Sequence, residues 1–164
     1  MRIRDARENE AAALTELMRS AKRSWGYPDE WMQALDSGLI ITAEDLSGMR
    51  VRVAEDEDSV LGFYGLVGSD RKVQLEHLWV RPDQMGKGVG RSLLRHALSE
   101  AARVGAEIVA IESDPNAESI YFRLGAVRVG EVAAPMRGAP DRKLPFLEIA
   151  VWRSSPAVSP KPAG

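Results

Sequence analysis

The sequence predicts an α/β (α+β) fold in which helices pack on a mixed β-sheet. After residue 50 the elements follow the order strand, strand, strand, helix, strand, helix, strand, strand, which suits a sheet covered by helices. Within that order, residues 73–102 have the pattern of a strand, a glycine-rich loop and an amphipathic helix. The chain has 164 residues, enough for one domain with its own core, and we expect that domain to span residues 1–153.

Apolar periodicity and turn residues place the individual elements. Alternating or continuous apolar runs bounded by turn residues predict strands at residues 2–6, 50–55, 59–68, 73–80, 107–112, 126–131 and 146–153. Apolar residues spaced three and four apart predict helices at residues 8–22, 29–35, 89–102 and 114–124. Residues 36–48 fit neither pattern, 133–144 is predicted to be a loop, and the prolines of 154–164 predict a disordered tail.

Composition excludes several classes of protein. The net charge is −2, from 22 basic and 24 acidic residues, so no global attraction to nucleic acid or to an anionic membrane is expected. Cysteine is absent, which excludes disulfides and a thiolate nucleophile, and with only His77 and His96 as imidazoles we expect no metal site. No apolar run approaches about 18 residues and the N-terminus lacks a signal-peptide core, so a cytoplasmic protein is expected.

The glycine-rich loop indicates a phosphate-binding site. Gly86, Gly88 and Gly90 alternate with other residues, which leaves the backbone N–H groups open to a ligand. The predicted helix that follows directs the positive end of its dipole to the same place, and Lys87 and Arg91 add positive charge. A tight turn without a ligand is the alternative.

Two common phosphate-binding motifs do not fit this loop. The P-loop pattern G-x-x-x-x-G-K-[ST] fails because Gly88 follows Lys87 and Arg81 occupies the first glycine position. The dinucleotide pattern G-x-G-x-x-G also fails, since counting from Gly88 places Leu93 at the last glycine.

A third pattern does fit. The segment Leu78-Trp79-Val80-x-Pro82 followed by Gly86-Lys87-Gly88-Val89-Gly90 resembles the acetyl-CoA motif of the GCN5-related N-acetyltransferases, the GNAT superfamily. Their loop pattern [Q/R]-x-x-G-x-[G/A] falls on residues 85–90, where Met85 departs from the usual Gln or Arg. A second similarity lies in residues 114–126, where Asn116, Ala117, Tyr121 and Gly125 match the family's later helix.

The resemblance implies a fold, a co-substrate and a set of contacts. The implied fold is a GNAT-type mixed, mostly antiparallel central sheet of about seven strands flanked by about four helices. The implied co-substrate is acetyl-CoA, with the backbone of the strand end binding the pantetheine arm as an added strand would. The implied coenzyme contacts are Leu78, Trp79, Val80, Met85, Gly86, Lys87, Gly88, Val89, Gly90, Arg91 and Asn116.

Acetyl transfer to an amine also needs a base and an acid. Glu76 is the expected base, because several family members carry a glutamate there that acts through water, and partial burial in a strand raises a carboxyl pKa. His77, which faces the other way if the strand is regular, is the second candidate. Tyr121 matches the tyrosine that the family uses as general acid toward the coenzyme thiolate. The alternatives are a solvated glutamate and a packed helix aromatic.

Two groups of residues are candidates for the acceptor site. The first mixes aromatic and acidic side chains that could receive a cationic amine, or could simply fill the edge of the core: Trp25, Tyr27, Asp29, Glu30 and Trp31. The second is the set of three cations in the 133–144 loop, which could meet an acidic group or could be solvated: Arg137, Arg142 and Lys143.

Three functions fit these residues. The first is an acetyl-CoA-dependent N-acetyltransferase that acts on a primary amine of a small molecule by direct attack in a ternary complex. The second is a protein lysine or N-terminal acetyltransferase, and the third is a non-catalytic acyl-CoA-binding module. The expected partners are acetyl-CoA and an amine acceptor, with neither nucleic acid nor membrane, and the chain is expected to be a monomer or a homodimer.

Overall fold

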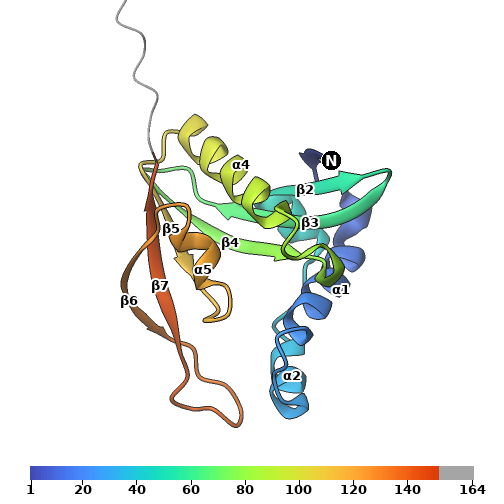
Figure 1. Ribbon diagram of the computed structural model, residues 1–164, viewed down its shortest axis with the longest axis vertical. Helices are drawn as coiled ribbons and strands as arrows, with labels where there is room; N and C mark the ends of the chain where they lie inside the picture. The colour runs from blue at the N-terminus through green and yellow to red at the C-terminus, as the bar shows by residue number, and fades with distance from the viewer. Residues whose placement is uncertain (152–164) are drawn as a thin grey trace, which may run out of the picture.

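One seven-stranded sheet organises the computed structural model, which describes residues 1–151 (Figure 1). The strand order is β1-β2-β3-β4-β5-β7-β6, and every neighbouring pair is antiparallel except β4 and β5. The strands are β1 (Arg2–Asp5), β2 (Arg50–Asp56), β3 (Ser59–Val67), β4 (Lys72–Val80), β5 (Ile108–Glu112), β6 (Val127–Ala133) and β7 (Lys143–Ala150). The predicted mixed, mostly antiparallel sheet is thus confirmed.

Helices cover both faces of this sheet. They are α1 (Ala11–Arg23), α2 (Asp29–Asp36), α3 (Ala43–Gly48), α4 (Val89–Arg103) and α5 (Glu118–Phe122), with single 3₁₀ turns at Glu8–Glu10 and Pro82–Gln84. Adjacent residues of β3 show the two layers, because Phe63 packs in the cluster under α1 and Tyr64 in the cluster under α4. Both side chains are fully buried, as expected for a central strand with helices on each side.

The structure corrects three element predictions. The unassigned residues 36–48 contain α3, which begins at a capping box in which Thr42 accepts from the Asp45 N–H at 3.1 Å and the Asp45 carboxylate accepts from the Thr42 N–H at 2.8 Å. The helix predicted at residues 114–124 shrinks to α5, because the Asp114 carboxylate accepts the Asn116 N–H at 2.9 Å and forms a turn first. The last strand begins at Lys143 rather than at residue 146, and the predicted tail, residues 154–164, lies outside the described residues.

The sheet opens between β4 and β5. These two strands pair only at Lys72–Ile108, Val73–Val109 and Gln74–Ala110, after which β5 follows β7 while β4 continues to Val80. Figure 1 shows the strands diverging, with α5 beside the opening. On this side, the second half of β4 therefore has backbone N–H and C=O groups that no strand of the described chain pairs with.

A bulge in β4 changes the expected directions of Glu76 and His77. Gly65 of β3 pairs with His77 and the next residue, Leu66, pairs with Leu75, so Glu76 is an extra residue in the ladder. The expectation that these two side chains face opposite ways assumed a regular strand, and that condition does not hold. The Glu76 side chain is exposed, whereas His77 is half-buried against Phe63 with ring centroids 6.0 Å apart.

Candidate active site

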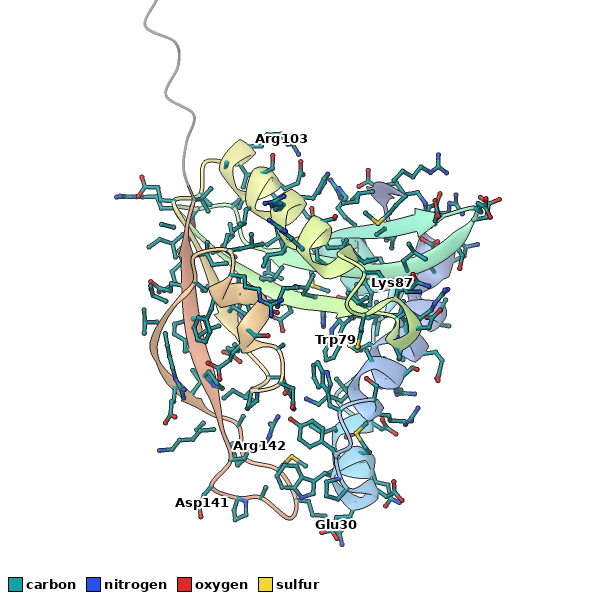
Figure 2. The ribbon with its side chains drawn as sticks, viewed as in Figure 1. Glu30, Trp79, Lys87, Arg103, Asp141 and Arg142 are labelled. Atoms are coloured by element: carbon teal, nitrogen blue, oxygen red, sulfur yellow. The ribbon has the colours of Figure 1, made fainter. Side chains whose placement is uncertain are left out.

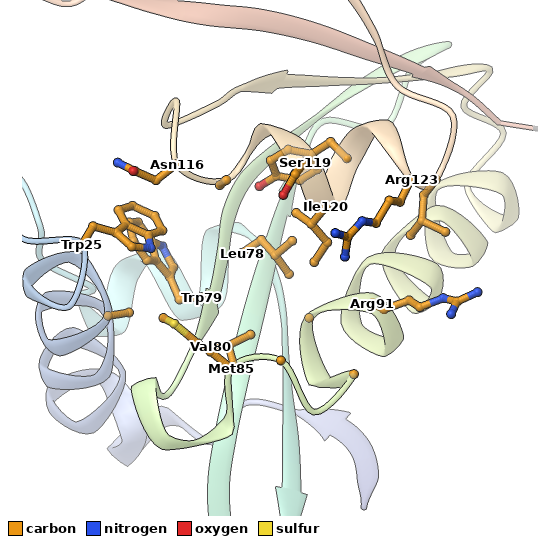
Figure 3. Close-up of a pocket in the computed structure, with 17 residues that line it drawn as sticks. Trp25, Leu78, Trp79, Val80, Met85, Arg91, Asn116, Ser119, Ile120 and Arg123 are labelled. Atoms are coloured by element: carbon orange, nitrogen blue, oxygen red, sulfur yellow. The ribbon is translucent and has the colours of Figure 1, made fainter.

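A pocket occupies this opening (Figure 3). Its volume is about 640 Å³, and its walls are the end of β4, the glycine loop, the N-terminus of α4, the α5 region and the C-terminal end of α1. From the predicted site, it is lined by Leu78, Trp79, Val80, Met85, Gly86, Gly88, Gly90, Arg91, Asn116 and Tyr121. Two separate segments of the sequence, residues 78–91 and 116–121, thus meet around one cavity.

Two predicted coenzyme contacts do not line the pocket. The Val89 side chain is 4% exposed and packs into the core beneath α4, because it occupies the inward face of the first helical turn. Lys87 is exposed at the tip of the loop.

The loop geometry provides the unpaired N–H groups that a phosphate needs. Gly86 and Gly88 have φ angles of +76° and +87°, a backbone region that L side chains rarely adopt. Gly88 caps α4, and the helical hydrogen bonds begin only with Ser92 N–H to Gly88 O at 3.0 Å. The Lys87 N–H donates to Gln84 O at 3.4 Å, whereas the N–H groups of residues 88–91 have no backbone acceptor in a preceding turn. These free N–H groups and the positive end of the helix dipole lie together at the start of α4.

Sequence reasoning missed several residues of the pocket wall. They are Ala21, Ser119, Ile120, Arg123 and Leu124. Trp25, expected at the acceptor site, and Ala117, part of the second sequence match, also line this pocket. Arg123 matters most electrostatically, because Figure 3 shows its guanidinium group on the same side of the pocket as that of Arg91. The two cations come from α4 and from the end of α5, and together they suit an anionic coenzyme.

Glycine also brings α4 close to the α5 region. A Cβ atom at Gly90 would lie 2.8 Å from Ile120 Cδ1 and 3.3 Å from Val80 Cγ2. Both neighbours line the pocket, so the absence of a side chain at Gly90 sets the width of the pocket where the three elements meet.

Tyr121 lines the pocket with a buried side chain. Its side chain is 5% exposed, and burial raises the phenol pKa above its ordinary value, with the Asp114 charge acting in the same direction. Within residues 1–151 the hydroxyl makes no hydrogen bond to another side chain or to the backbone, although it borders the cavity. A neutral phenol with an unused donor can give a proton to a ligand atom.

A buried polar cluster joins α1 to the turn before α5. Lys22, 4% exposed, forms an ion pair with Asp114, and the Tyr27 hydroxyl donates to the Asp114 carboxylate at 2.9 Å. Asn116 Nδ2 contacts the Tyr27 hydroxyl and Asp114 Oδ1, each at 2.9 Å. Burial lowers the pKa of Lys22 and raises that of Tyr27 to about 12.

This cluster orients Asn116. Because its amide nitrogen is used by Asp114 and Tyr27, its amide oxygen is left as an acceptor on a residue that lines the pocket. A pantetheine arm carries amide N–H donors that such an oxygen can accept. The sequence match placed Asn116 on a helix, whereas it lies in the turn before α5.

Glu76 and His77 lie outside the pocket lining. Partial burial raises the pKa of the Glu76 carboxyl group, and the negative charges of Glu112 and Asp45 raise it further. Gln74 Nε2 donates to Glu76 Oε2 at 3.0 Å. Burial lowers the pKa of His77, whose Nδ1 accepts from the Trp79 Nε1–H at 3.3 Å, so the imidazole is already engaged.

The aromatic residues after α1 form two ring pairs. Trp25 lines the pocket and packs on Trp79 with ring centroids 5.8 Å apart. Tyr27 stacks on Trp31 of α2 with centroids 5.8 Å apart and an interplanar angle of 15°. Of these aromatics, Trp25 therefore lies against the end of β4 and belongs to the pocket wall.

Among residues 1–151, no helix combines the length and the apolar character needed to cross a membrane. No group of three or more His, Cys, Asp or Glu side chains in the same residues could hold a metal ion.

Comparisons with known proteins agree with this geometry. Residues 11–126 match the family model described as "Acetyltransferase (GNAT) family". The L-amino acid N-acyltransferase MnaT of Escherichia coli (strain K12) is 33% identical over 138 residues, which cover 77% of this chain and 80% of that protein.

Solved structures share the fold at lower identity. A GCN5-related N-acetyltransferase from Rhodopseudomonas palustris superposes with a TM-score of 0.76 at 22% identity, covering 91% of this chain and 94% of the other. YncA, an acetyltransferase from Salmonella typhimurium solved with its cofactor acetyl-CoA, has a TM-score of 0.68 at 21% identity, with coverages of 97% and 99%. The chain belongs to the GNAT family of acetyltransferases.

Proposed function

We propose that this acyltransferase moves an acetyl group from acetyl-CoA to a primary amine of a small molecule, by direct attack in a ternary complex. The observation that carries the proposal is the pocket itself, in which the unpaired edge of β4, the glycine loop and the Tyr121 hydroxyl group surround one cavity. The acetyl-CoA bound to the Salmonella relative and the N-acyltransferase name of the E. coli relative support the same reaction.

The proposed chemistry assigns each group a step. The amine nitrogen attacks the thioester carbon, a C–N bond forms, and the C–S bond breaks to release the CoA thiolate. Backbone N–H groups in the range 78–80 stabilise the developing oxyanion, because the β5 side of this strand end is unpaired. Tyr121 gives its proton to the departing sulfur, and its raised pKa keeps that proton in place near neutral pH.

Glu76 is the proposed base that accepts the proton of the amine. Since its exposed carboxyl group does not line the pocket, we propose that it acts through an intervening water molecule. A base is needed because alkylamines are mostly protonated at neutral pH. The raised pKa of Glu76 lies closer to that pH than the ordinary carboxyl value, which suits a general base.

The dependence of activity on pH tests the role of Glu76, with Glu112 as a nearby charge that can be removed. Activity should rise with pH as Glu76 loses its proton, and Glu76→Gln should remove that limb. Glu112→Gln removes a negative charge that raises the Glu76 pKa, so the limb should move to lower pH while the maximum rate persists. An unmoved limb in both variants would remove Glu76 from the mechanism.

The acceptor side favours a small molecule over a protein. The β6–β7 loop reaches α2, where a Cβ atom at Gly138 would lie 3.1 Å from Glu30 Oε1 and 3.9 Å from Trp31 Nε1. The β6–β7 loop and α2 thus approach each other at this end of the molecule, whereas a protein substrate needs an open groove. Acetyl transfer to a lysine or to a protein N-terminus thus remains an outcome of the test rather than the proposal.

Thiol release separates the candidate functions. The protein is mixed with acetyl-CoA and a panel of small primary amines, and free CoA thiol is measured over time. Release that depends on a small amine supports the proposal. Release seen only with protein acceptors, read by mass spectrometry of acetylated lysines and N-termini, favours the protein acetyltransferase. Coenzyme binding without release under any condition indicates a non-catalytic module.

A further inference from the structure

We propose that the acceptor of this enzyme is an arylalkylamine, a monoamine that carries a flat apolar ring, and that Trp25 and Trp79 bind this ring. The inference rests on the proposed function, because it names the class of the second substrate of that reaction. It rests structurally on a pocket whose two ends differ in character, one cationic and the other aromatic.

The cationic end of the pocket suits the phosphates of the coenzyme. Arg91 and Arg123 line it, beside the glycine loop and the N-terminus of α4. Figure 3 shows both guanidinium groups on one side of Leu78 and the rings of Trp25 and Trp79 on the other side. A coenzyme whose phosphates bind at the cationic end therefore leaves the aromatic end of the same pocket to the second substrate.

The aromatic end is a wall of half-buried apolar side chains. Trp25 and Trp79 both line the pocket, and their ring centroids lie 5.8 Å apart with an interplanar angle of 32°, so the two rings form one continuous surface. Met85, 36% exposed, also lines the pocket, and its sulfur atom lies 3.9 Å from the Ser24 hydroxyl oxygen. Figure 2 shows Trp79 where α1 approaches β4, on the side toward α2. A flat apolar group that covers this wall removes its surface from water.

The polar groups of this wall are largely bonded within the protein. The Trp79 Nε1–H donates to His77 Nδ1 at 3.3 Å, and the Ser24 hydroxyl donates to the backbone oxygen of Ala21 at 2.6 Å. The Trp25 Nε1–H makes no hydrogen bond within residues 1–151, so it is available to a water molecule or to a polar substituent on the ring. The wall therefore selects by shape and apolar contact rather than by a set of hydrogen bonds.

The charges at this end oppose a second ammonium group. The buried Lys22 ammonium lies 5.2 Å from the centroid of the Trp25 ring and 4.9 Å from that of Tyr27, so these two rings already interact with a cation. The carboxylate that balances Lys22 is Asp114, which the Tyr27 hydroxyl also uses. Among the described residues, none that lines the pocket is acidic. A diamine or polyamine would thus bring a second positive charge near Lys22 without an anion to offset it, whereas a neutral ring brings none.

The experiment compares amines that differ in one feature. Ethylamine and 2-phenylethylamine differ by the ring, and butylamine and 1,4-diaminobutane differ by the second ammonium group. Each amine is assayed with acetyl-CoA by thiol release, and each is titrated into the CoA-loaded protein by calorimetry to measure binding without turnover. Butyryl-CoA in place of acetyl-CoA, with ethylamine as the acceptor, tests whether the aromatic end holds the acyl chain instead.

Two tryptophan variants locate the ring. Trp25→Leu removes the indole from the pocket wall and keeps an apolar side chain there. Trp31→Leu is the matched control, because Trp31 is half-buried like Trp25 and lies in the next helix, α2, but does not line the pocket. Melting temperatures verify that each variant is folded.

The expected results are specific to the ring. The wild type should prefer 2-phenylethylamine to ethylamine by about 10-fold or more in kcat/KM, because burial of an aromatic ring contributes on that scale. It should also prefer butylamine to 1,4-diaminobutane. Trp25→Leu should lower the ratio of kcat/KM between 2-phenylethylamine and ethylamine by about 3- to 10-fold, since a ring pair contributes beyond its buried area. Trp31→Leu should leave that ratio unchanged.

The outcomes keep the two proposals apart. Equal use of ethylamine and 2-phenylethylamine, a preference for the diamine, or a ratio that Trp25→Leu leaves intact or that Trp31→Leu lowers equally overturns the aromatic subsite while the acetyltransferase stands. A change in the preference for butyryl-CoA in Trp25→Leu, without a change among the amines, assigns the aromatic end to the acyl chain and also overturns the subsite. Trp25-dependent binding of 2-phenylethylamine without any thiol release supports the subsite and overturns the proposed reaction. Absence of both binding and release overturns both.

Discussion

Replacing Tyr121 by phenylalanine separates chemistry from packing, because only the hydroxyl oxygen is lost. The ring is 5% exposed and keeps its burial in the variant. Since the hydroxyl makes no hydrogen bond within the described chain, its removal leaves no orphaned partner, and we expect a stability change below about 1 kcal/mol. For a domain of this size that is less than about 2–4 °C in melting temperature.

The expected effect on turnover is much larger. One positioned general acid contributes about 10²-fold or more, and 10²-fold corresponds to about 2.7 kcal/mol of transition-state stabilisation. In steady-state assays of thiol release, kcat should fall by that factor in Tyr121→Phe while the affinity for acetyl-CoA stays near its original value.

Tyr64 provides the matched control. It is fully buried under α4, and its hydroxyl is bonded to His96 Nδ1 at 2.8 Å, away from the pocket lining. Tyr64→Phe should lose about 1 kcal/mol of stability and keep its turnover, which is the opposite signature. Full turnover in Tyr121→Phe would refute the acid role, and the thiolate would then leave unprotonated or take its proton from water.

Two further variants test the loop and the buried cluster. At a concentration of one hundred times its dissociation constant, acetyl-CoA should stabilise the protein by about 2.7 kcal/mol, or about 5–10 °C, and Gly88→Asp should abolish this shift by placing a negative charge in the glycine loop. Gly125→Asp has the same backbone strain, at φ +88° against +87° with open space around each Cβ, and should keep the shift. Asp114→Asn leaves the Lys22 cation buried and unpaired, so it should lose about 3 kcal/mol in denaturant unfolding, and adding Lys22→Met should recover part of that loss.

The part of the fold that rests on local signals could be predicted from the sequence. Residues 73–102 carry strong periodicity and three glycines, and the structure confirms β4, the loop and α4 there. The six-residue α3 escaped prediction, since it has no room for a repeating apolar pattern and its capping box uses Asp45 in place of the usual Glu or Gln. The bulge at Glu76 could not be predicted either, because the sequence pattern was interpreted as a regular strand in which side chains alternate between the two faces.

The site residues that belong to a short sequence motif could be predicted, whereas those that come together only through tertiary contacts could not. Asn116 and Tyr121 could be found from a motif, and the structure brings both to the pocket. The Lys22–Asp114 pair joins residues 92 positions apart, and nothing local in either segment indicates the other. Arg123 was missed for a related reason, since only the docking of α5 against α4 turns it toward the coenzyme pocket.

The central claim is direct transfer of an acetyl group from coenzyme to amine in this pocket, and the most direct test follows both products. Acetyl-CoA and an accepted amine are varied against each other while CoA thiol and N-acetylated amine are measured together, and the mass of the protein is checked after incubation with acetyl-CoA alone. The account predicts equal amounts of the two products, intersecting double-reciprocal lines and an unmodified protein. Thiol release without amine, parallel lines, or an acetylated protein that passes its acetyl group to the amine would contradict it.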